Sequence, residues 1–164
     1  MDISQFDKYI EEMKKMSRKA NAIPVQNAVS EPTPDMSGQG FLMVNVTSAR
    51  SIYPVKNALV TIFKGDVTNM EKLFEDYTDE SGKTRLFSLP APPISTAQSA
   101  DSTEIPFATY NILTQAEGFT DTINYNAAVF DKVTSIQNVN LLPRTIANKG
   151  DDTIIINEYD SYEL

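Results

Sequence analysis

Cysteine, histidine and tryptophan are all missing from the 164-residue sequence. The first absence excludes disulfides, thiolate nucleophiles and Cys-type zinc sites. The second removes the usual general base at neutral pH and the commonest metal-ligating side chain, so a Ser–His–Asp triad cannot form. Carboxylates, lysines, tyrosines and hydroxyls are the groups that remain for chemistry. We therefore expect a protein that is not an enzyme and that has neither a cofactor nor a metal site.

Long apolar runs and basic clusters are missing too. No apolar run approaches the ~20 residues that a membrane-spanning helix needs. The formal net charge is −8, and no basic stripe or phosphate-binding motif is present, which argues against a nucleic-acid partner. Residues 1–20 carry charges throughout and have no central apolar stretch, unlike a secretory signal. The sequence thus predicts a protein made in the cytoplasm without such a signal, with no transmembrane segment and no nucleic-acid partner.

The first 39 residues divide into a predicted helix and a linker. Within residues 1–20, apolar side chains recur at spacings of three and four, which is typical of one face of an amphipathic helix: Ile3, Phe6, Ile10 and Met13. One short helix is marginal in water, so this face needs a surface to cover, in its own domain, another subunit or a membrane interface. Residues 21–39 are predicted to be a linker because they are rich in residues that break helices and sheets: Pro24, Pro32, Pro34 and Gly38.

Residues 40–143 have the pattern of a β domain. Short segments rich in branched and aromatic residues alternate with turn-forming residues, and the predicted strands are residues 41–46, 58–64, 72–78, 83–89, 108–116, 119–124 and 135–142. Residues 79–82 are predicted to form a turn, and Pro90 to end the fourth strand because proline cannot donate a ladder hydrogen bond. The fold class we expect is mainly β, a seven-stranded antiparallel β-sandwich of the transthyretin or immunoglobulin type.

Residues 144–164 form an acidic tail with a single apolar segment. Ile154, Ile155 and Ile156 follow one another between acidic residues, which predicts a strand that must pair with another strand. Two partners are open: an edge of the chain's own sheet, or a neighbouring subunit by strand addition. Together with the apolar face of the helix, these isoleucines are the candidate assembly residues, and they predict a homo-oligomer or a larger protein assembly.

Three stretches of the β domain carry a resemblance to a known family. The first is V-K-N-A-L-V-T-I at 55–62, followed by T-D-E-S-G-K-T at 78–84. The second is L-P-A-P-P at 89–93, with P-F-A-T-Y-N-I at 106–112 and A-E-G-F at 116–119. The third is V-F-D-K-V-T-S-I-Q at 129–137, ending V-N-L-L-P at 139–143. Residues 40–143 resemble the carboxypeptidase regulatory-like, transthyretin-type domain, and within it the non-catalytic domain of spore cortex-lytic pre-proteins and peptidoglycan-associated proteins of clostridia-like bacteria.

The resemblance implies a β-sandwich accessory domain in spore or cell-envelope biology. It does not imply cortex hydrolysis, since in such proteins the hydrolytic work belongs to a separate domain. The predicted helix at the start and the acidic tail depart from the family pattern. A location in the spore or cell envelope, and a peptidoglycan partner, are therefore expectations that come from the resemblance.

Acidic side chains are the only groups that suggest catalysis or metal binding. A glycosidase needs two carboxyls ~5–10 Å apart, and five acids cluster in the sequence: Glu71, Glu75, Asp76, Asp79 and Glu80. Calcium needs six or more oxygens, and the candidates are Asp79, Glu80 and Ser81, or Asp151 and Asp152. No EF-hand spacing is present, and a cleft lined by tryptophan is impossible. We interpret these acids as a solvated strand end and surface turns.

Two tyrosines are candidates for stacking on sugars. Tyr53 and Tyr125 are predicted to lie in loops, whereas Tyr110 alternates with Ile112 on one strand face and is predicted to lie in the core. A Lys–Asn amide crosslink, as in wall-adhesin sandwiches, would need a lysine on the first strand. Residues 41–46 contain none, although Asn138 and Asn140 are available on the last strand.

Three functions follow from these patterns. The first is a non-enzymatic structural or assembly module of a spore or cell-envelope structure, which self-associates through its terminal segments. The second is an accessory domain that binds peptidoglycan or another glycan. The third is a carboxylate-based wall hydrolase, against which the missing histidine, cysteine and tryptophan count. We expect the first.

Overall fold

The computed structural model describes residues 34–98, 105–144 and 153–158. These residues belong to a unit that begins at Pro34. The predicted helix, with its apolar residues Ile3, Phe6, Ile10 and Met13, lies outside the described residues. Most of the predicted linker, the pair Asp151 and Asp152, and the end of the tail after Glu158 also lie outside them.

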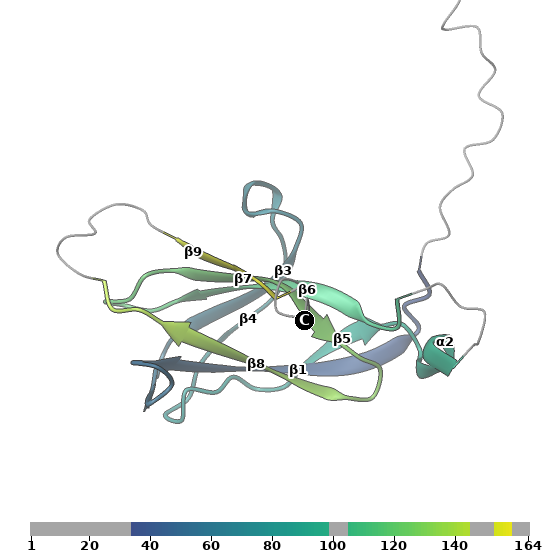
Figure 1. The fold of residues 1–164 in the computed structure, drawn as a ribbon, viewed down its shortest axis with the longest axis horizontal. Coiled ribbons are helices and arrows are strands. Elements are labelled where there is room, and N and C mark those ends of the chain that lie inside the picture. The colour runs from purple at the N-terminus through teal and green to yellow at the C-terminus, as the bar shows by residue number, and fades with distance from the viewer. Residues whose placement is uncertain (1–33, 99–104, 145–152, 159–164) are drawn as a thin grey trace, which may run out of the picture. The chain divides into compact units, whose positions relative to one another are not determined.

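Two β-sheets stack face to face (Figure 1). Sheet A contains β1 (Gly38–Ser48), β2 (Tyr53–Pro54), β5 (Phe87–Ala91) and β8 (Thr134–Leu141). Sheet B has the order β4-β3-β6-β7-β9 and contains β3 (Leu59–Lys64), β4 (Glu71–Tyr77), β6 (Ala108–Gln115), β7 (Thr122–Val129) and β9 (Ile154–Asn157). The helical elements of the described residues are short: the 3-10 helix η1 (Val67–Asn69) and the helix α2 (Ile94–Gln98).

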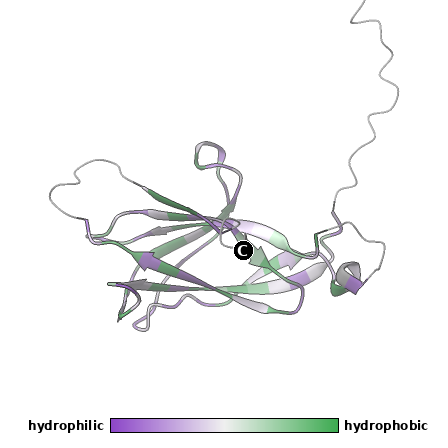
Figure 2. Ribbon diagram, in the orientation of Figure 1, coloured by the Kyte–Doolittle hydropathy of each residue, from purple (hydrophilic) through white to green (hydrophobic). Residues whose placement is uncertain are grey.

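An apolar core fills the space between the two sheets. In β1, Leu42, Val44 and Val46 are at most 1% exposed, and the residues between them face the other way, as the period of a strand requires. Both sheets contribute the remaining large core side chains: Val60, Ile62, Phe87, Leu89, Tyr110, Ile112, Val129, Val139 and Leu141. Figure 2 shows apolar and polar residues mixed along the strands of both layers. The prediction of a mainly β, two-layered sandwich is confirmed.

The number of strands and their directions differ from the prediction. The described residues form nine strands, whereas seven were expected in the β domain and one more in the tail, and two ladders are parallel: β8 with β1, and β9 with β7. The chain leaves β7 in sheet B, turns at residues 130–133, and enters β8 in sheet A in the same direction as β1. Side chains alternate in the same way in parallel and antiparallel strands, so hydrophobic periodicity could not reveal these directions.

Some strand boundaries also differ from those expected. Pro90 does not end its strand but lies within β5, where it is opposite Gln39 and exposed. β5 is at the outer side of sheet A, where a missing N–H costs no ladder bond. The strand expected at 119–124 instead runs over Thr122–Val129 and includes a bulge near Asn126, which has a positive φ of 64°.

Candidate functional site

The edge of sheet B formed by β7 and β9 is the candidate site, and Figure 1 shows the two strands side by side. β9 lies parallel to β7 in a register of four pairs that begins with Thr122 opposite Ile154. The ladder starts where the Ile154 N–H donates to the Asp121 carbonyl oxygen at 2.9 Å. The isoleucine segment of the tail is thus the outermost strand of sheet B, on the chain's own sheet.

Polar side chains fasten the end of β9. The Glu158 carboxylate accepts hydrogen bonds from Asn124 Nδ2 at 2.7 Å and from Gln137 Nε2 at 2.8 Å. Asn124 belongs to β7 in sheet B and Gln137 to β8 in sheet A, so one carboxylate oxygen bridges the two sheets. Beside this bridge, Asn126 Nδ2 donates to Asn157 Oδ1 at 2.9 Å.

The interior behind β9 is polar, unlike the rest of the core. Thr114, Thr122 and Asn124 are at most 1% exposed. Within the described residues, the Thr114 hydroxyl and the Asn124 Oδ1 have no hydrogen-bond partner. Unsatisfied buried polar atoms each cost about 1–3 kcal/mol. This part of the sandwich therefore contributes less stability than the apolar core between β1 and β6.

Three isoleucines near this edge leave much of their surface in water. Ile155 is 64% exposed and Ile156 is 37% exposed on β9, and Ile136 on β8 is 57% exposed. They do not form one patch: Ile155 and Ile156 are successive strand residues and point to opposite faces of sheet B, and Ile136, opposite Met43 on β1, lies on the outer side of sheet A. A partner that covered them would remove apolar surface from water at about 25 cal/mol per Å².

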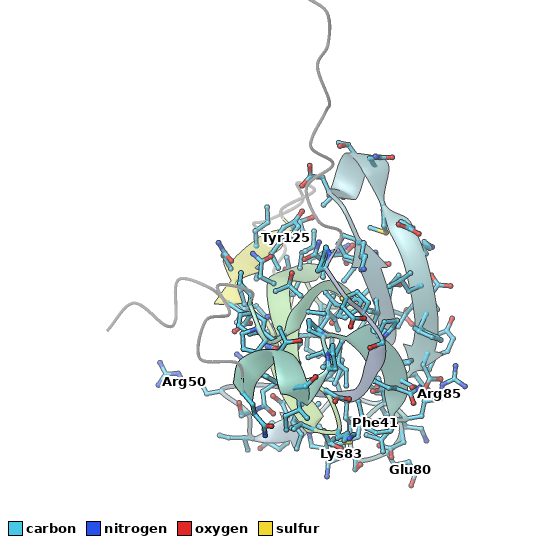
Figure 3. All side chains as sticks on the ribbon, turned by 90° about the vertical axis from the view of Figure 1, so that its right-hand side faces the viewer. Phe41, Arg50, Glu80, Lys83, Arg85 and Tyr125 are labelled. Atoms are coloured by element: carbon cyan, nitrogen blue, oxygen red, sulfur yellow. The ribbon has the colours of Figure 1, made fainter. Side chains whose placement is uncertain are left out.

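The two candidate sugar-binding tyrosines are on different sheets. Tyr53 lies in β2 of sheet A and is 64% exposed. Tyr125 lies in β7 of sheet B, is half-buried, and makes an edge-to-face contact with Phe63 at a ring-centroid distance of 6.4 Å. Figure 3 shows Tyr125 close to β9. Both tyrosines were expected in loops, and that placement was wrong. Because the two tyrosines lie on strands of different sheets, they do not form one aromatic surface on which a sugar could stack.

The clustered acids do not converge on one point. Glu75 pairs with Lys72 at 2.8 Å, and this ammonium lowers the pKa of Glu75. The remaining ion pairs of the cluster are Asp76 with Arg85 at 3.5 Å and Glu80 with Lys56 at 2.9 Å. Figure 3 shows Glu80 and Arg85 at the periphery of the sandwich. Among the described residues, no group of three or more acidic side chains is arranged to hold a metal ion.

Asp79 organises the turn after β4 rather than a binding site. Its Oδ1 accepts hydrogen bonds from the Ser81 N–H, the Ser81 hydroxyl and the Lys83 N–H, at 2.7–3.0 Å. The Ser81 hydroxyl, together with the Lys83 N–H, lowers the pKa of Asp79. Gly82 has a φ of +76°, and a Cβ there would lie 2.3 Å from the Val46 carbonyl oxygen. The T-D-E-S-G-K-T motif therefore has a structural role in this chain.

An open hollow at the end of the sandwich contains a residue that sequence reasoning missed. It is lined by Ser37, Gly38, Gln39, Phe41, Pro93, Asp131 and Lys132. Asp131 is only 7% exposed, and its carboxylate accepts backbone N–H groups from Gln39 at 2.9 Å and Ile94 at 3.0 Å. The Gln39 N–H, followed by that of Ile94, lowers the pKa of Asp131. These bonds tie the start of β1 and the start of α2 to the β7–β8 connection.

The asparagines considered for a crosslink make ordinary hydrogen bonds. Asn138 Oδ1 accepts from Asn45 Nδ2 at 3.0 Å across the β1–β8 ladder. Asn140 Oδ1 accepts from the Ser51 N–H at 3.2 Å. Both side chains belong to the outer, solvent-facing side of sheet A.

The two stacked sheets place the chain in the class of β-sandwich proteins. No protein-family model matches the sequence, and no curated protein matches it. Among the described residues, no helix has the length and apolarity to cross a membrane.

Several solved structures are similar in fold. The Bacillus anthracis TIE protein is 11% identical over 65% of this chain and 17% of that chain, with a TM-score of 0.41. Catechol 1,2-dioxygenase from Acinetobacter sp. ADP1 is 15% identical over 93% and 75%, with a TM-score of 0.44. The shaft pilin SpaA from Lactobacillus rhamnosus GG is 13% identical over 73% and 46%, with a TM-score of 0.32.

These likenesses carry no argument about function. This chain spans 17% of the TIE protein and 62% of a 3-chlorocatechol 1,2-dioxygenase from Rhodococcus opacus 1CP, less than two thirds of either. Because all of these TM-scores are below 0.5, the assignment to the β-sandwich class rests on the sheets themselves.

Proposed function

We propose that this chain is a non-enzymatic structural module that self-associates through its terminal segments to build a larger assembly. The observation that carries the proposal is the exposed apolar side chains of β9, the outermost strand of sheet B. Ile155 is 64% exposed and Ile156 is 37% exposed there. Exposed apolar side chains on an edge strand favour contact with another protein surface.

The distribution of acids supports the non-enzymatic part of the proposal. Glu75, Asp76 and Glu80 are each paired with a cation on the surface, and Asp79 is occupied by its own turn. The buried polar side chains Thr114, Thr122 and Asn124 are hydroxyls and an amide, which are poor acids and bases at neutral pH. We therefore propose no catalytic pair of carboxylates for this chain.

The location of the assembly in a spore or cell envelope is a further part of the proposal. Its support is the resemblance of residues 40–143 to the non-catalytic domains of spore cortex-lytic pre-proteins. Extraction of intact spores or cell walls, followed by immunoblotting of each fraction, tests it. Recovery of the chain only in the soluble cell extract would count against this location.

Light scattering tests the self-association directly. We expect the full chain to scatter as a multiple of its 18.2 kDa mass, and a chain ending at Arg144 to scatter as a single chain. Arg144 is a suitable end because its N–H donates to the Gly118 carbonyl at 2.8 Å, so the shortened chain keeps this bond and loses β9. Equal association of both chains would contradict the tail's role.

A pair of surface substitutions tests the isoleucines themselves. Replacing Ile155 and Ile156 by serine should reduce association, because two exposed apolar side chains leave the edge. The matched control replaces Ile52 and Val67, which are 69% and 46% exposed elsewhere on the molecule, by serine. Association that falls equally in both variants would mean that general surface hydrophobicity, and not this edge, holds the copies together.

A glycan-binding accessory domain remains the alternative, and the exposure of Tyr53 favours it. An exposed tyrosine ring beside the exposed Ile52 could stack on a sugar face. Retention on purified sacculi that is lost in Tyr53→Ala, but kept in Tyr77→Ala with its similarly exposed ring, would support this alternative.

A further inference from the structure

We propose that β9 is exchanged between copies, so that residues 153–158 of one copy lie along β7 of a second copy. This inference rests on the proposed self-association and names the segment that is donated and the strand that accepts it. The same ladder and side-chain bonds that hold β9 on its own β7 would then hold the two copies together. The occupant is the tail of a second copy of this chain.

The attachment of β9 to its own domain is small. Among the described strands, β9 pairs with β7 alone, over four residue pairs. Ile154 is half-buried, whereas Ile155 and Ile156 leave much of their surface in water. A strand held by few ladder bonds and little apolar burial opens at low cost. β9 can therefore leave β7 without disrupting the core between β1 and β6.

The surface that β9 covers is complementary to a particular segment of this sequence. Asn124 Nδ2 and Gln137 Nε2 both donate to the Glu158 carboxylate, and Asn126 Nδ2 donates to the Asn157 side-chain oxygen. Gln137 Nε2 also donates to the Asn138 carbonyl oxygen at 3.3 Å. Asn124 is 1% exposed, so losing its acceptor would leave a buried donor unsatisfied. A segment that replaces these acceptors in the same register carries side-chain oxygens at two successive positions directly after its apolar residues. The I-I-I-N-E sequence at 154–158 has this order, and a second copy supplies it.

Both ends of the connection to β9 meet at Asp121. The Arg144 guanidinium lies 3.6 Å from the Asp121 carboxylate, and the Ile154 N–H donates to the Asp121 carbonyl at 2.9 Å. Nine residues, 145–153, join Arg144 to Ile154. A chain of that length reaches at most ~30 Å when extended, which is enough to bring β9 to an adjacent copy. β9 makes the same bonds with β7 of its own copy and with β7 of another copy. The protein concentration therefore determines what fraction of the copies exchange β9.

Single-cysteine variants test the exchange, because the natural sequence has no cysteine to interfere. Thr122 and Ile154 are opposite one another on β7 and β9. Full-length Thr122→Cys and Ile154→Cys chains are mixed in urea, refolded together, oxidised and resolved by mass. We expect several-fold more Thr122–Ile154 disulfide heterodimer than in the control mixture of Ile154→Cys with Ile52→Cys, whose cysteine is exposed elsewhere.

The double variant Thr122→Cys/Ile154→Cys is the companion measurement. If it crosslinks within one chain while the mixture yields no heterodimer above the control, β9 stays on its own copy and the inference is overturned. If neither the double variant nor the mixture of single variants forms a disulfide, β9 does not occupy β7 and the inference also fails. Association of the natural chain without heterodimer would leave the proposed assembly standing and remove only the exchange. A natural chain that is monomeric in light scattering would remove both.

Discussion

Thr78 fastens the start of β3 to the turn after β4, and removing its hydroxyl should destabilise the whole sandwich. The side chain is 2% exposed, and its hydroxyl accepts the Ala58 N–H at 2.9 Å and donates to the Val55 carbonyl at 2.6 Å. Thr78→Val keeps the shape of the side chain but leaves this buried N–H and this carbonyl without their partner. Each group left unsatisfied costs about 1–3 kcal/mol, so the free energy of unfolding should fall by about 2–6 kcal/mol.

The loss is large compared with the total stability of a domain. With a typical free energy of unfolding of about 5–15 kcal/mol, a change of this size lowers Tm by roughly 10 °C. Because the chain has no tryptophan, circular dichroism in a urea titration is a suitable measurement. Thr78→Ser retains the hydroxyl and loses one methyl group, so its expected loss is smaller, about 1 kcal/mol.

Two outcomes would refute this reasoning about Thr78. The first is equal destabilisation by Thr78→Val and Thr78→Ser, since the hydroxyl would then contribute nothing. The second is a Thr78→Val loss no larger than that of Thr68→Val, in which an exposed threonine of η1 receives the same substitution.

Three further changes should alter stability in a defined direction. Gly82→Ala forces a left-handed φ of +76° on a residue with a Cβ and brings that Cβ against the Val46 carbonyl, so urea titration should give a loss of roughly 2 kcal/mol or more. Tyr110→Phe removes the hydroxyl that donates to the Pro90 carbonyl at 2.6 Å between the two sheets, and should cost about 1 kcal/mol in the same assay. The lowered pKa of Asp131 means that its contribution is complete above the ordinary value of about 3.9 and is lost as the pH falls through the lower, folded-state value. Asp131→Asn should therefore flatten the dependence of stability on pH below about 4, and an unchanged slope would contradict the role of this carboxylate.

The sequence pattern was sufficient to predict where most of the core lies. Residues 41–46 were predicted to form a strand, and the alternation of side chains along it puts Leu42, Val44 and Val46 on one face, where they are core residues of β1. Tyr110 and Ile112 were likewise expected to be buried, and they are 1% and 0% exposed. Such positions are predictable because the period of a strand is local and does not depend on which strand lies next to it.

Long-range features were not predictable from the same pattern. Asp131 is isolated in the sequence, and the N–H groups that it accepts are 92 and 37 residues away. The bridge from Glu158 to Asn124 and Gln137 joins residues 34 and 21 positions apart on three elements. Neither contact has a local signature, because each depends on the order in which the strands are assembled into sheets. Only the D-x-S-G turn at 79–82, whose bonds span at most four residues, was foreseeable.

Native mass spectrometry of the full-length chain tests the central claim most directly. A module that assembles through its tail should give ions at integral multiples of 18.2 kDa, with the multiples lost when the chain ends at Arg144. Ions of the single chain alone, at every concentration tested, would contradict the claim.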